Sequence, residues 1–307
     1  MIFQAVRDES RNVAISRLLK LYGCSRASYY RFKAKNQTVH DQIDKDLKAR
    51  IAEIYQQSGK AYGAPRIYRE LKVLGIQTST KRIARLMKEL GIRGTEKKES
   101  QSPAYRPETA GYADHVARHF QADSPNKLWV SDITYVRCRS GWLYLAVVLD
   151  LFSRRVVGFS CDIHQRASLV SQALGMALYE RNISEGLVFH SDHGGQYRSK
   201  QVARILDYYN VTGSMGRIAS PADNACAEAF MSTFKAECGR KLKHLDACDA
   251  QIAIFNYIAG FYNNTRRHST LGYLSPVEFE RQYYKQQNDQ IGGSLTAITK
   301  QLELLTV

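Results

Sequence analysis

The segment GLVFHSDHGGQY, residues 186–197, changes character abruptly after a short apolar run. Residues 187–189 have the composition of a buried β-strand, and His190, Asp192, His193 and a glycine pair follow at once. One interpretation is a sharp turn and nothing more, because glycine accepts the backbone angles that turns need. The other is a functional site at the carboxyl end of a strand, where a metal ion or a phosphate can bind.

The length and composition of the chain indicate a globular protein of more than one domain. It has 307 residues, of which 44% are hydrophobic, so it can bury a sizeable core. No run of 18 apolar residues occurs, and the first residues contain scattered charges instead of a signal core. Its six cysteines form no CxxC pair, which favours reduced thiols over disulfides or a zinc site. We therefore expect a cytoplasmic protein with no membrane partner.

The positive charge of the chain is concentrated near its N-terminus. The formal net charge is +15, and residues 1–110 hold 23 Lys and Arg against 11 Asp and Glu. The remaining residues hold 21 against 18. A basic region of this kind favours a polyanionic partner, most often nucleic acid. The alternative is a lysine-rich helical domain whose charges only keep the protein soluble.

Two segments of the basic region have the pattern of helix, turn and helix. They are residues 12–34, with a turn at Gly23, and residues 64–91, with a turn at Gly75. The expected N-caps of the second helices are Ser25 or Ser28 in the first segment and Ser79 or Thr80 in the second. In the second segment the apolar positions are Ile83, Leu86, Met87 and Leu90, and the opposite face carries Lys81, Arg82, Arg85 and Lys88. We expect those four cations to contact DNA, although an ordinary helical hairpin with a charged outer face has the same pattern.

Alternating strand and helix patterns begin after a linker at residues 96–127, which is rich in Pro, Ser and Gly. The expected strands are 128–138, 141–152, 154–163, 187–190 and 211–215, and the expected helices are 166–181, 199–209 and one from 223. Three antiparallel strands followed by alternating helices and strands is the order of a ribonuclease-H-like domain. The fold class is therefore α/β, with a mixed five-stranded sheet and helices on both faces, preceded by all-α helix-turn-helix domains.

Three acidic residues stand out against this pattern of strands and helices. Asp132 lies inside the first strand, Asp192 follows the fourth, and Glu228 lies in the final helix. If the first and fourth strands are neighbours, the two aspartates lie side by side and Glu228 can complete the cluster. Converging carboxylates repel each other, and hard divalent cations such as Mg²⁺ or Mn²⁺ relieve that repulsion. Each acid alone is more ordinary, since it can be paired, shape a turn or face solvent.

The motifs around these acids resemble a known family. WVSDITY, HSDHGGQY and ADNACAEAF resemble the acidic motifs of DDE transposases of the retroviral-integrase-like group, in which 35 residues commonly separate the last two acids, as they separate Asp192 from Glu228 here. YNNTRRHSTLGYLSPVEFE, residues 262–280, and YGAPRIYREL resemble other segments of that group. The chain is most similar to the second-frame, catalytic-core product of bacterial insertion sequences.

This resemblance implies a function and a set of residue roles. Asp132, Asp192 and Glu228 would be the catalytic residues and the ligands of two Mg²⁺ or Mn²⁺ ions, roughly 4 Å apart, that act in phosphodiester transfer. Lys235, two helical turns after Glu228, would contact the transposon end. The expected partners are double-stranded transposon and target DNA, a second copy of the chain and the first-frame protein of the same element, in the bacterial cytoplasm at the nucleoid. The alternatives are a plain nuclease without strand transfer and a DNA-binding regulator with an inactive core.

Several other polar residues have less specific interpretations. His190 and His193 are expected as hydrogen-bond partners or turn residues, Asn224 as a helix cap and Cys226 as a packing residue. Arg266 and Arg267 are predicted DNA contacts, although they can equally pair with acids nearby in sequence, namely Glu278 or Glu280. The expected domain organisation is a helix-turn-helix-like segment at 1–40, a DNA-binding helix-turn-helix domain at 41–95, the linker at 96–127, the catalytic core at 128–283 and a tail at 284–307.

Overall fold

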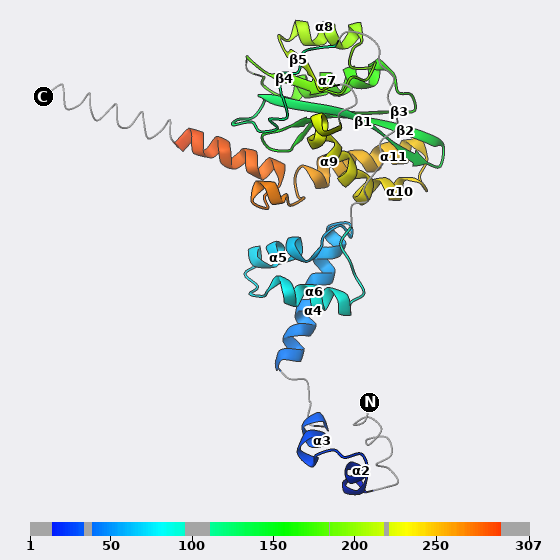
Figure 1. Ribbon diagram of the computed structural model, residues 1–307, viewed down its shortest axis with the longest axis vertical. Coiled ribbons are helices and arrows are strands. Elements are labelled where there is room, and N and C mark those ends of the chain that lie inside the picture. Colours follow the sequence, from blue (N-terminus) through cyan, green and yellow to red (C-terminus); the bar gives the residue numbers. More distant parts are fainter. Residues whose placement is uncertain (1–13, 34–38, 96–110, 184, 218–220, 290–307) are drawn as a thin grey trace, which may run out of the picture.

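A computed structural model describes residues 14–33, 39–95, 111–183, 185–217 and 221–289, and all structural statements concern these ranges. In the described part of residues 1–110, helices are the only regular secondary structure (Figure 1). These are α2 (Ile15–Leu21), α3 (Arg26–Lys33), α4 (Val39–Gln57), α5 (Ala64–Val73) and α6 (Thr80–Glu89). None of the described helices is long and apolar enough to cross a membrane.

The helix-turn-helix pattern at 64–91 corresponds to α5 and α6, which pack with α4 around a small apolar core. Ser79 is the N-cap of α6, because its hydroxyl accepts a hydrogen bond from the Arg82 amide at 3.2 Å. Gly75 between the helices has φ +74°, a conformation that favours glycine. Ile83, Leu86 and Met87 are buried at helical spacing, whereas Leu90, expected on the same face, is exposed at the end of the helix.

Five strands form one sheet in the order β3-β2-β1-β4-β5 (Figure 1). They are β1 (Leu128–Cys138), β2 (Gly141–Asp150), β3 (Val156–Asp162), β4 (Val188–Ser191) and β5 (Thr212–Met215). β1, β2 and β3 are antiparallel neighbours, while β4 pairs in parallel with both β1 and β5. This arrangement confirms the predicted fold class and the predicted adjacency of the first and fourth strands.

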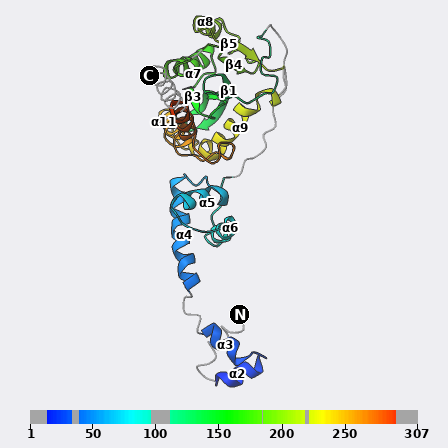
Figure 2. The same cartoon turned by 90° about the vertical axis from the view of Figure 1, so that its left-hand side faces the viewer.

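Helices cover both faces of the sheet (Figures 1 and 2). One face packs against α7 (Ala167–Glu180) and α8 (Lys200–Tyr208), and the other against α9 (Ala225–Phe234) and α11 (Ala247–Phe255). Side chains of a strand point to alternate faces, so Trp129 belongs to the first layer and Val130 to the second. Because both faces are buried, β2 is almost continuously apolar from Leu143 to Leu149, whereas β1 also carries Ser131, Asp132 and Thr134.

Shorter elements surround α9 and α11. The 3₁₀ helix η1 (Pro221–Asn224) leads into α9, and the π-helical turn η2 (Lys235–Gly239) and α10 (Arg240–Leu242) follow it. The π-helical segment η3 (Asn256–Tyr262) continues α11, and η4 (Ser269–Leu271) precedes a helix at 276–289. Residues 290–307 of the predicted tail lie outside the described ranges.

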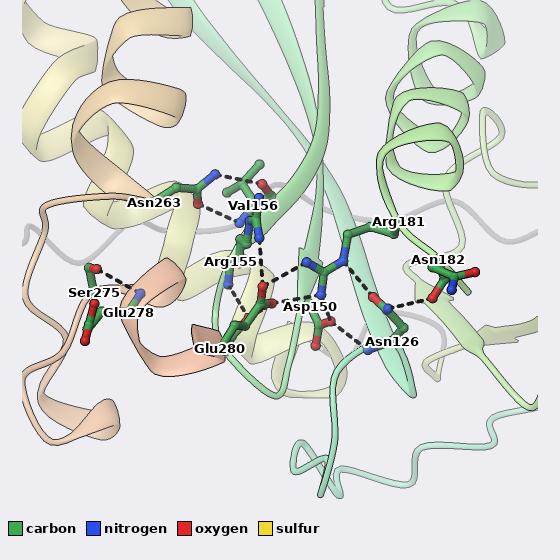
Figure 3. A network of polar contacts seen from close by, with 11 residues as sticks. Asn126, Asp150, Arg155, Val156, Arg181, Asn182, Asn263, Ser275, Glu278 and Glu280 are labelled. Carbon is green, nitrogen blue, oxygen red and sulfur yellow. Dashed lines mark hydrogen bonds and ion pairs between the residues drawn. The ribbon is translucent and has the colours of Figure 1, made fainter. Parts of the chain in front are cut away.

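A polar network attaches the helix at 276–289 to the core (Figure 3). The buried carboxylate of Glu280 accepts hydrogen bonds from Ser153 and Arg155, both at 2.7 Å, and from two nitrogens of Arg181 at 2.8 and 2.9 Å. In the same region the side-chain amide of Asn263 bonds the backbone nitrogen and oxygen of Val156 at 3.0 and 2.9 Å. These bonds anchor the segment after the sheet, so it forms part of the core.

The α4–α6 unit contacts the segment that follows η3. The guanidinium of Arg267 binds the carboxylate of Glu70 on α5 through two hydrogen bonds, at 2.7 and 3.0 Å. The hydroxyl of Tyr62 accepts a hydrogen bond from the Arg267 amide at 2.9 Å, and Phe261 packs against the α4–α6 core. The Lys241 ammonium also donates to the Gly59 carbonyl at 2.9 Å. Polar and apolar contacts therefore connect the α4–α6 unit to the part of the chain that contains the sheet.

Candidate active site

The two candidate aspartates lie level with each other on neighbouring strands. In the parallel pairing of β1 and β4, Val130 is opposite His190. Two residues further along each strand direction are Asp132, inside β1, and Asp192, immediately after β4. The order of the strands thus brings together two carboxylates that are 60 residues apart in sequence.

Glu228 lies over the same face of the sheet. Asp132 occupies the same alternation as Val130 and Val136, whose side chains pack toward α9. Glu228 is in the first turn of α9, where it is exposed, while Phe230 and other residues of this helix are buried against the sheet. The three acids therefore come from β1, the end of β4 and α9, all on one face.

Two hydrogen bonds fasten the start of α9 to the strands beside the aspartates. The side-chain amide of Asn224 donates to the carbonyl of Ser131, next to Asp132, at 2.9 Å. The buried imidazole of His190, two residues before Asp192, bonds the carbonyl of Asp223 through Nε2 at 2.8 Å. Asn224 occupies the N-cap position of α9 as expected, but its side chain makes no cap bond and reaches β1 instead.

The His190 imidazole is neutral in this setting. Burial, the largest effect, lowers its pKa, although the bond to the Asp223 carbonyl opposes this. Because a carbonyl only accepts, Nε2 carries the proton, and Nδ1 accepts from the Ser214 hydroxyl at 2.9 Å. One neutral ring thus joins β4, β5 and η1, consistent with the expected hydrogen-bonding role of His190.

The charges of the three acids affect one another. The pKa of Asp132 is raised to about 7, first by burial and then by the negative charges of Asp192 and Glu228. A hydrogen bond from the Ile133 amide and the charge of Lys235 act in the opposite direction. The pKa of Glu228 is also raised, first by the partial desolvation of its otherwise exposed side chain and then by the charge of Asp192. The folded protein therefore disfavours the negative charge that it collects here.

The glycine pair after Asp192 has a steric role at its first position. The Gly194 amide donates a hydrogen bond to Oδ1 of Asp192 at 2.9 Å. A Cβ atom at residue 194 would stand 2.9 Å from that same oxygen, so any side chain there would displace the carboxylate. Gly195 has open space around its Cα. The turn that ends the apolar run at 187–189 is thus shaped around the Asp192 carboxylate.

Within the described ranges, no group of three His, Cys, Asp or Glu side chains is gathered closely enough to hold a metal ion. The acids share one face without forming a finished ligand cage, and repulsion between carboxylates favours such separation. The buried Oδ1 of Asn224 also has no hydrogen-bond partner among the described residues. An oxygen without a partner beside the acids suits a water molecule or a hydrated cation.

Two buried polar residues near the acids lie within the quoted motifs but received no role from the sequence. Ser131 donates a hydrogen bond to the Val147 carbonyl at 2.7 Å, and its hydroxyl also bonds that of Tyr197 at 2.9 Å. Asp223 binds the guanidinium groups of Arg118 and Arg217 at 2.6 and 3.0 Å. In the sequence, each is recognisable only as a polar residue among residues that are expected to be buried. The hydrogen-bond partner of such a residue becomes known only from the fold.

The predicted DNA-contact residues fall into different environments. Lys81 and Lys88 are exposed on α6. Arg82 and Arg85, also on α6, bind the Asp44 carboxylate of α4, each at 2.7 Å. The ammonium of Lys235 lies 5.0 Å from the ring centroid of Tyr135 and is exposed. Asp44 is partly buried and Arg85 is exposed, and ion pairs near the surface are weak, so Arg82 and Arg85 can exchange Asp44 for a phosphate.

The structure assigns Arg266 a different role from the predicted one. Its side chain is 4% exposed and forms two hydrogen bonds, at 2.8 and 2.7 Å, with the buried carboxylate of Glu237. The Tyr257 hydroxyl donates to the same carboxylate at 2.9 Å. A guanidinium enclosed in this way cannot reach a phosphate, so its prediction as a DNA contact is wrong for this conformation.

The alternative partners expected for Arg266 and Arg267 are also wrong. Arg267 binds Glu70 instead, while Glu280 binds Arg155 and Arg181, and Glu278 binds Arg281. Arg267 and Glu280 thus have partners 99 to 197 residues away in sequence, whereas Glu278 pairs with Arg281 three residues later. Cys226 has a packing environment as expected, and its sulfur accepts a hydrogen bond from Arg154 at 2.9 Å.

Comparison with known proteins gives matches in both parts of the chain. Residues 122–221 and 209–276 match models of the integrase core domain, and residues 42–99 match a model of an HTH-like domain. The chain is 32% identical over 283 residues to the transposase InsF for insertion sequence IS3A of Escherichia coli, covering 91% of this chain and 98% of the relative.

Further similarities extend to another insertion element and to a solved structure. A 31 kDa protein of insertion element IS600 from Shigella sonnei is 32% identical over 269 residues, covering 87% of this chain and 99% of the relative. The integrase catalytic core domain of HTLV-2, solved in complex with magnesium, is 17% identical with a TM-score of 0.40 and covers 52% of this chain and 98% of that one. From the identity and coverage shared with InsF, the chain belongs to the transposases of insertion sequences that carry an integrase core domain, which move such elements by polynucleotidyl transfer.

Proposed function

We propose that Asp132, Asp192 and Glu228 are the catalytic residues with which this transposase cleaves and joins the ends of its insertion sequence. The observation that carries the proposal is the pairing of β1 with β4, in which Val130 is opposite His190. Asp132 in β1 and Asp192 just after β4 each follow the paired residue of their strand by two positions, on the face covered by the helix of Glu228. The bonds from Asn224 and His190 support it, because they hold that helix against the two strands.

The residues at this site fit divalent cations in their chemistry. Three carboxylates supply the hard oxygen ligands that Mg²⁺ and Mn²⁺ prefer. The raised pKa of Asp132 reflects negative charge that a cation would stabilise. Two ions, when bound, would supply activation of the attacking oxygen and stabilisation of the leaving oxygen. Since Glu228 is exposed in the first turn of α9, its side chain can rotate toward the aspartates.

The other parts of the chain would bind and position the DNA. Lys235, seven residues after Glu228, lies on the same face of its helix and would bind a phosphate of the transposon end. The cations of α6, Lys81, Arg82, Arg85 and Lys88, would bind duplex DNA with an affinity that falls as salt increases. We assign these contacts to a DNA-binding part at 41–95, joined by the linker at 96–127 to the catalytic core at 128–283. Arg267, held by Glu70, would contribute only if that pair opened.

The proposed partners follow from the reaction. Two transposon ends must be held together with target DNA, which requires at least two copies of the chain. The first-frame protein of the same element would supply DNA-binding elements additional to those of this chain. The relatives come from bacteria, so we place the reaction in the bacterial cytoplasm on nucleoid DNA.

The Asp192→Asn variant tests the catalytic assignment. It keeps the size of the side chain and removes its charge, so we expect loss of Mg²⁺-dependent cleavage of a labelled duplex that carries the element's end. Binding of that duplex should be retained. Asp207→Asn, at an exposed position of α8, is the matched control and should leave cleavage unchanged. Retained cleavage in Asp192→Asn would reject the assignment.

A second substrate separates a transposase from a plain nuclease. A preprocessed duplex with a free 3′-hydroxyl at the element's end needs no cleavage before it attacks target DNA. We expect the wild-type chain, together with its first-frame partner, to join this end to a plasmid in the presence of Mg²⁺. A plain nuclease would degrade DNA without joining it, and a regulator with an inactive core would do neither.

A further inference from the structure

The hairpin of β1 and β2 exposes a cluster of aromatic side chains. Tyr135 is 52% exposed and Trp142 is 47% exposed, although both belong to strands of the central sheet. Their ring centroids are 5.2 Å apart in an edge-to-face arrangement, and Tyr144 lies 6.4 Å from Tyr135. Single exposed aromatic side chains are ordinary, but rings in mutual contact with cations beside them form a surface that can bind a planar, negatively charged ligand.

Positive charges accompany these rings. The Lys235 ammonium lies 5.0 Å from the Tyr135 centroid, and the Arg137 guanidinium lies 5.3 Å from the Trp142 centroid. Further exposed cations are Arg139, Arg240, Lys241 and Lys243. They belong to the same region, because the Arg139 amide donates to the Leu245 carbonyl at 2.7 Å and α10 packs against β1. One acid nearby, Asp246, binds Arg139 at 3.3 Å.

The aromatic cluster adjoins the candidate active site. Tyr135 follows Asp132 on β1 by three residues, which corresponds to about 10 Å along a strand. Lys235, which touches Tyr135, follows Glu228 by seven residues on the helix over the same sheet. Because the spacing of three residues on β1 is odd, Tyr135 points to the sheet face opposite to Asp132. The Lys235 ammonium reaches the Tyr135 ring past the edge of β1, which pairs with β4 only as far as Val130. A DNA strand whose scissile phosphate lies at the acids would reach the rings by passing around this edge beside Lys235.

We propose that Tyr135 and Trp142 form a stacking surface for unpaired nucleotides next to the scissile phosphate, with Arg137 and Lys235 binding the backbone phosphates. The proposal rests on the DNA function above and adds a ligand class, because bases within a duplex already stack on each other and offer no free face. Aromatic side chains combined with cations are the common means of binding single-stranded nucleic acid. A second copy of the chain is the competing occupant of this surface.

Tryptophan fluorescence gives a direct test, because the chain has two tryptophans in opposite environments. Trp129 is fully buried and Trp142 is exposed. The probe is an oligothymidylate of about 12 nucleotides, compared with an abasic oligonucleotide of equal length and charge. In EDTA, we expect the oligothymidylate to quench the fluorescence of the wild-type chain strongly and the abasic strand to quench it weakly. Equal quenching by the two strands, or none, would overturn the proposal.

Substitutions then separate stacking from charge and from folding. Trp142→Ala should weaken binding of the oligothymidylate about tenfold and leave binding of the abasic strand nearly unchanged. Trp142→Phe should keep most of the affinity while removing the quenching. Tyr208→Ala, at an exposed aromatic position on α8, is the matched control and should alter neither. Equal losses on both strands, or a loss in Trp142→Phe equal to that in Trp142→Ala, would contradict stacking.

The stacking surface can also be separated from an interface between copies and from catalysis. Sedimentation velocity without DNA shows whether Trp142→Ala changes the oligomeric state of the chain. If Trp142→Ala dissociates an oligomer that the wild type forms and keeps the DNA affinity of the wild type, the surface is an interface between copies and the proposal is overturned. Binding in EDTA needs no bound metal and no reaction, so it is independent of the catalytic assignment. Retained cleavage in Asp192→Asn would reject that assignment alone, whereas unchanged binding in Trp142→Ala would reject the stacking surface alone.

Discussion

Replacing Asp132 by asparagine should stabilise the metal-free protein above neutral pH. The pKa of this carboxyl is raised from an ordinary value of 3.8 to about 7 by burial and by its acidic neighbours. Between these values the folded protein keeps the proton that the unfolded chain has lost. The folded state therefore binds more protons, and its stability falls as the pH rises through this interval. Asparagine has no such charge, so Asp132→Asn escapes the loss.

The structure sets the size of the effect. The interval from 3.8 to about 7 corresponds to about 4 kcal/mol, at about 1.4 kcal/mol for each pKa unit. Because Asp132 is only partly buried and water screens its charge, we expect a gain of about 2–4 kcal/mol at pH 8. Near pH 4 the carboxyl is largely neutral in the folded protein, and the two proteins should differ little. Urea unfolding in EDTA at pH 4, 6 and 8 measures this difference.

A matched substitution and added metal complete the experiment. Asp123→Asn, at an exposed loop position, should show no comparable gain with pH. With Mg²⁺ the stability advantage of Asp132→Asn should shrink by about 2.7 kcal/mol, because a ligand at 100 times its Kd stabilises the folded state by that amount only where it binds. An Asp132→Asn protein that is less stable than wild type at pH 8 in EDTA would refute the reasoning.

Two further predictions concern residues that hold the site and its surroundings. Asn224→Ala removes the amide that bonds the Ser131 carbonyl, so we expect a loss of about 1–3 kcal/mol in urea unfolding and a larger fall in the rate of Mg²⁺-dependent cleavage than in DNA affinity. An unchanged cleavage rate would contradict the positioning role. Arg266→Ala leaves Glu237 buried without its partner and should cost about 3–5 kcal/mol, whereas the double variant Arg266→Met with Glu237→Leu should recover most of it. A normal melting temperature with weakened DNA binding in Arg266→Ala would restore Arg266 as a DNA contact.

The strands of the sheet could be predicted from the sequence because strand patterns and turn residues are local features of the chain. The runs that form β1 and β2 are rich in β-branched and aromatic residues and meet at Ser140-Gly141, which predicts a hairpin without any distant contact. That β1 and β4 are neighbours had to be inferred from the order of strands and helices along the chain, which is typical of one order of strands in the sheet. That inference alone places Asp132 and Asp192 on adjacent strands.

Ion pairs and exposure were less predictable because they depend on which distant surfaces meet. Arg266 finds Glu237, 29 residues earlier, and Arg267 finds Glu70, 197 residues earlier, while the acids closest in sequence bind other arginines. Trp129 and Trp142 have similar strand neighbours in the sequence, yet one is fully buried and the other is half-exposed. Only the packing of helices over the sheet decides such cases.

The bonds that hold the helix carrying Glu228 are made by neutral groups. The helix that carries Glu228 is fastened by an amide, Asn224, and by a neutral imidazole, His190, to residues beside the two aspartates. A lysine or arginine in either place could also fasten the helix, but its positive charge would partly neutralise the nearby carboxylates. Neutral donors hold the backbone, and the charge of Lys235 compensates that of the acids only in part. The same arrangement makes the metal-free site a source of instability. Asp132→Asn should therefore raise the stability of the metal-free protein and remove the activity of the chain.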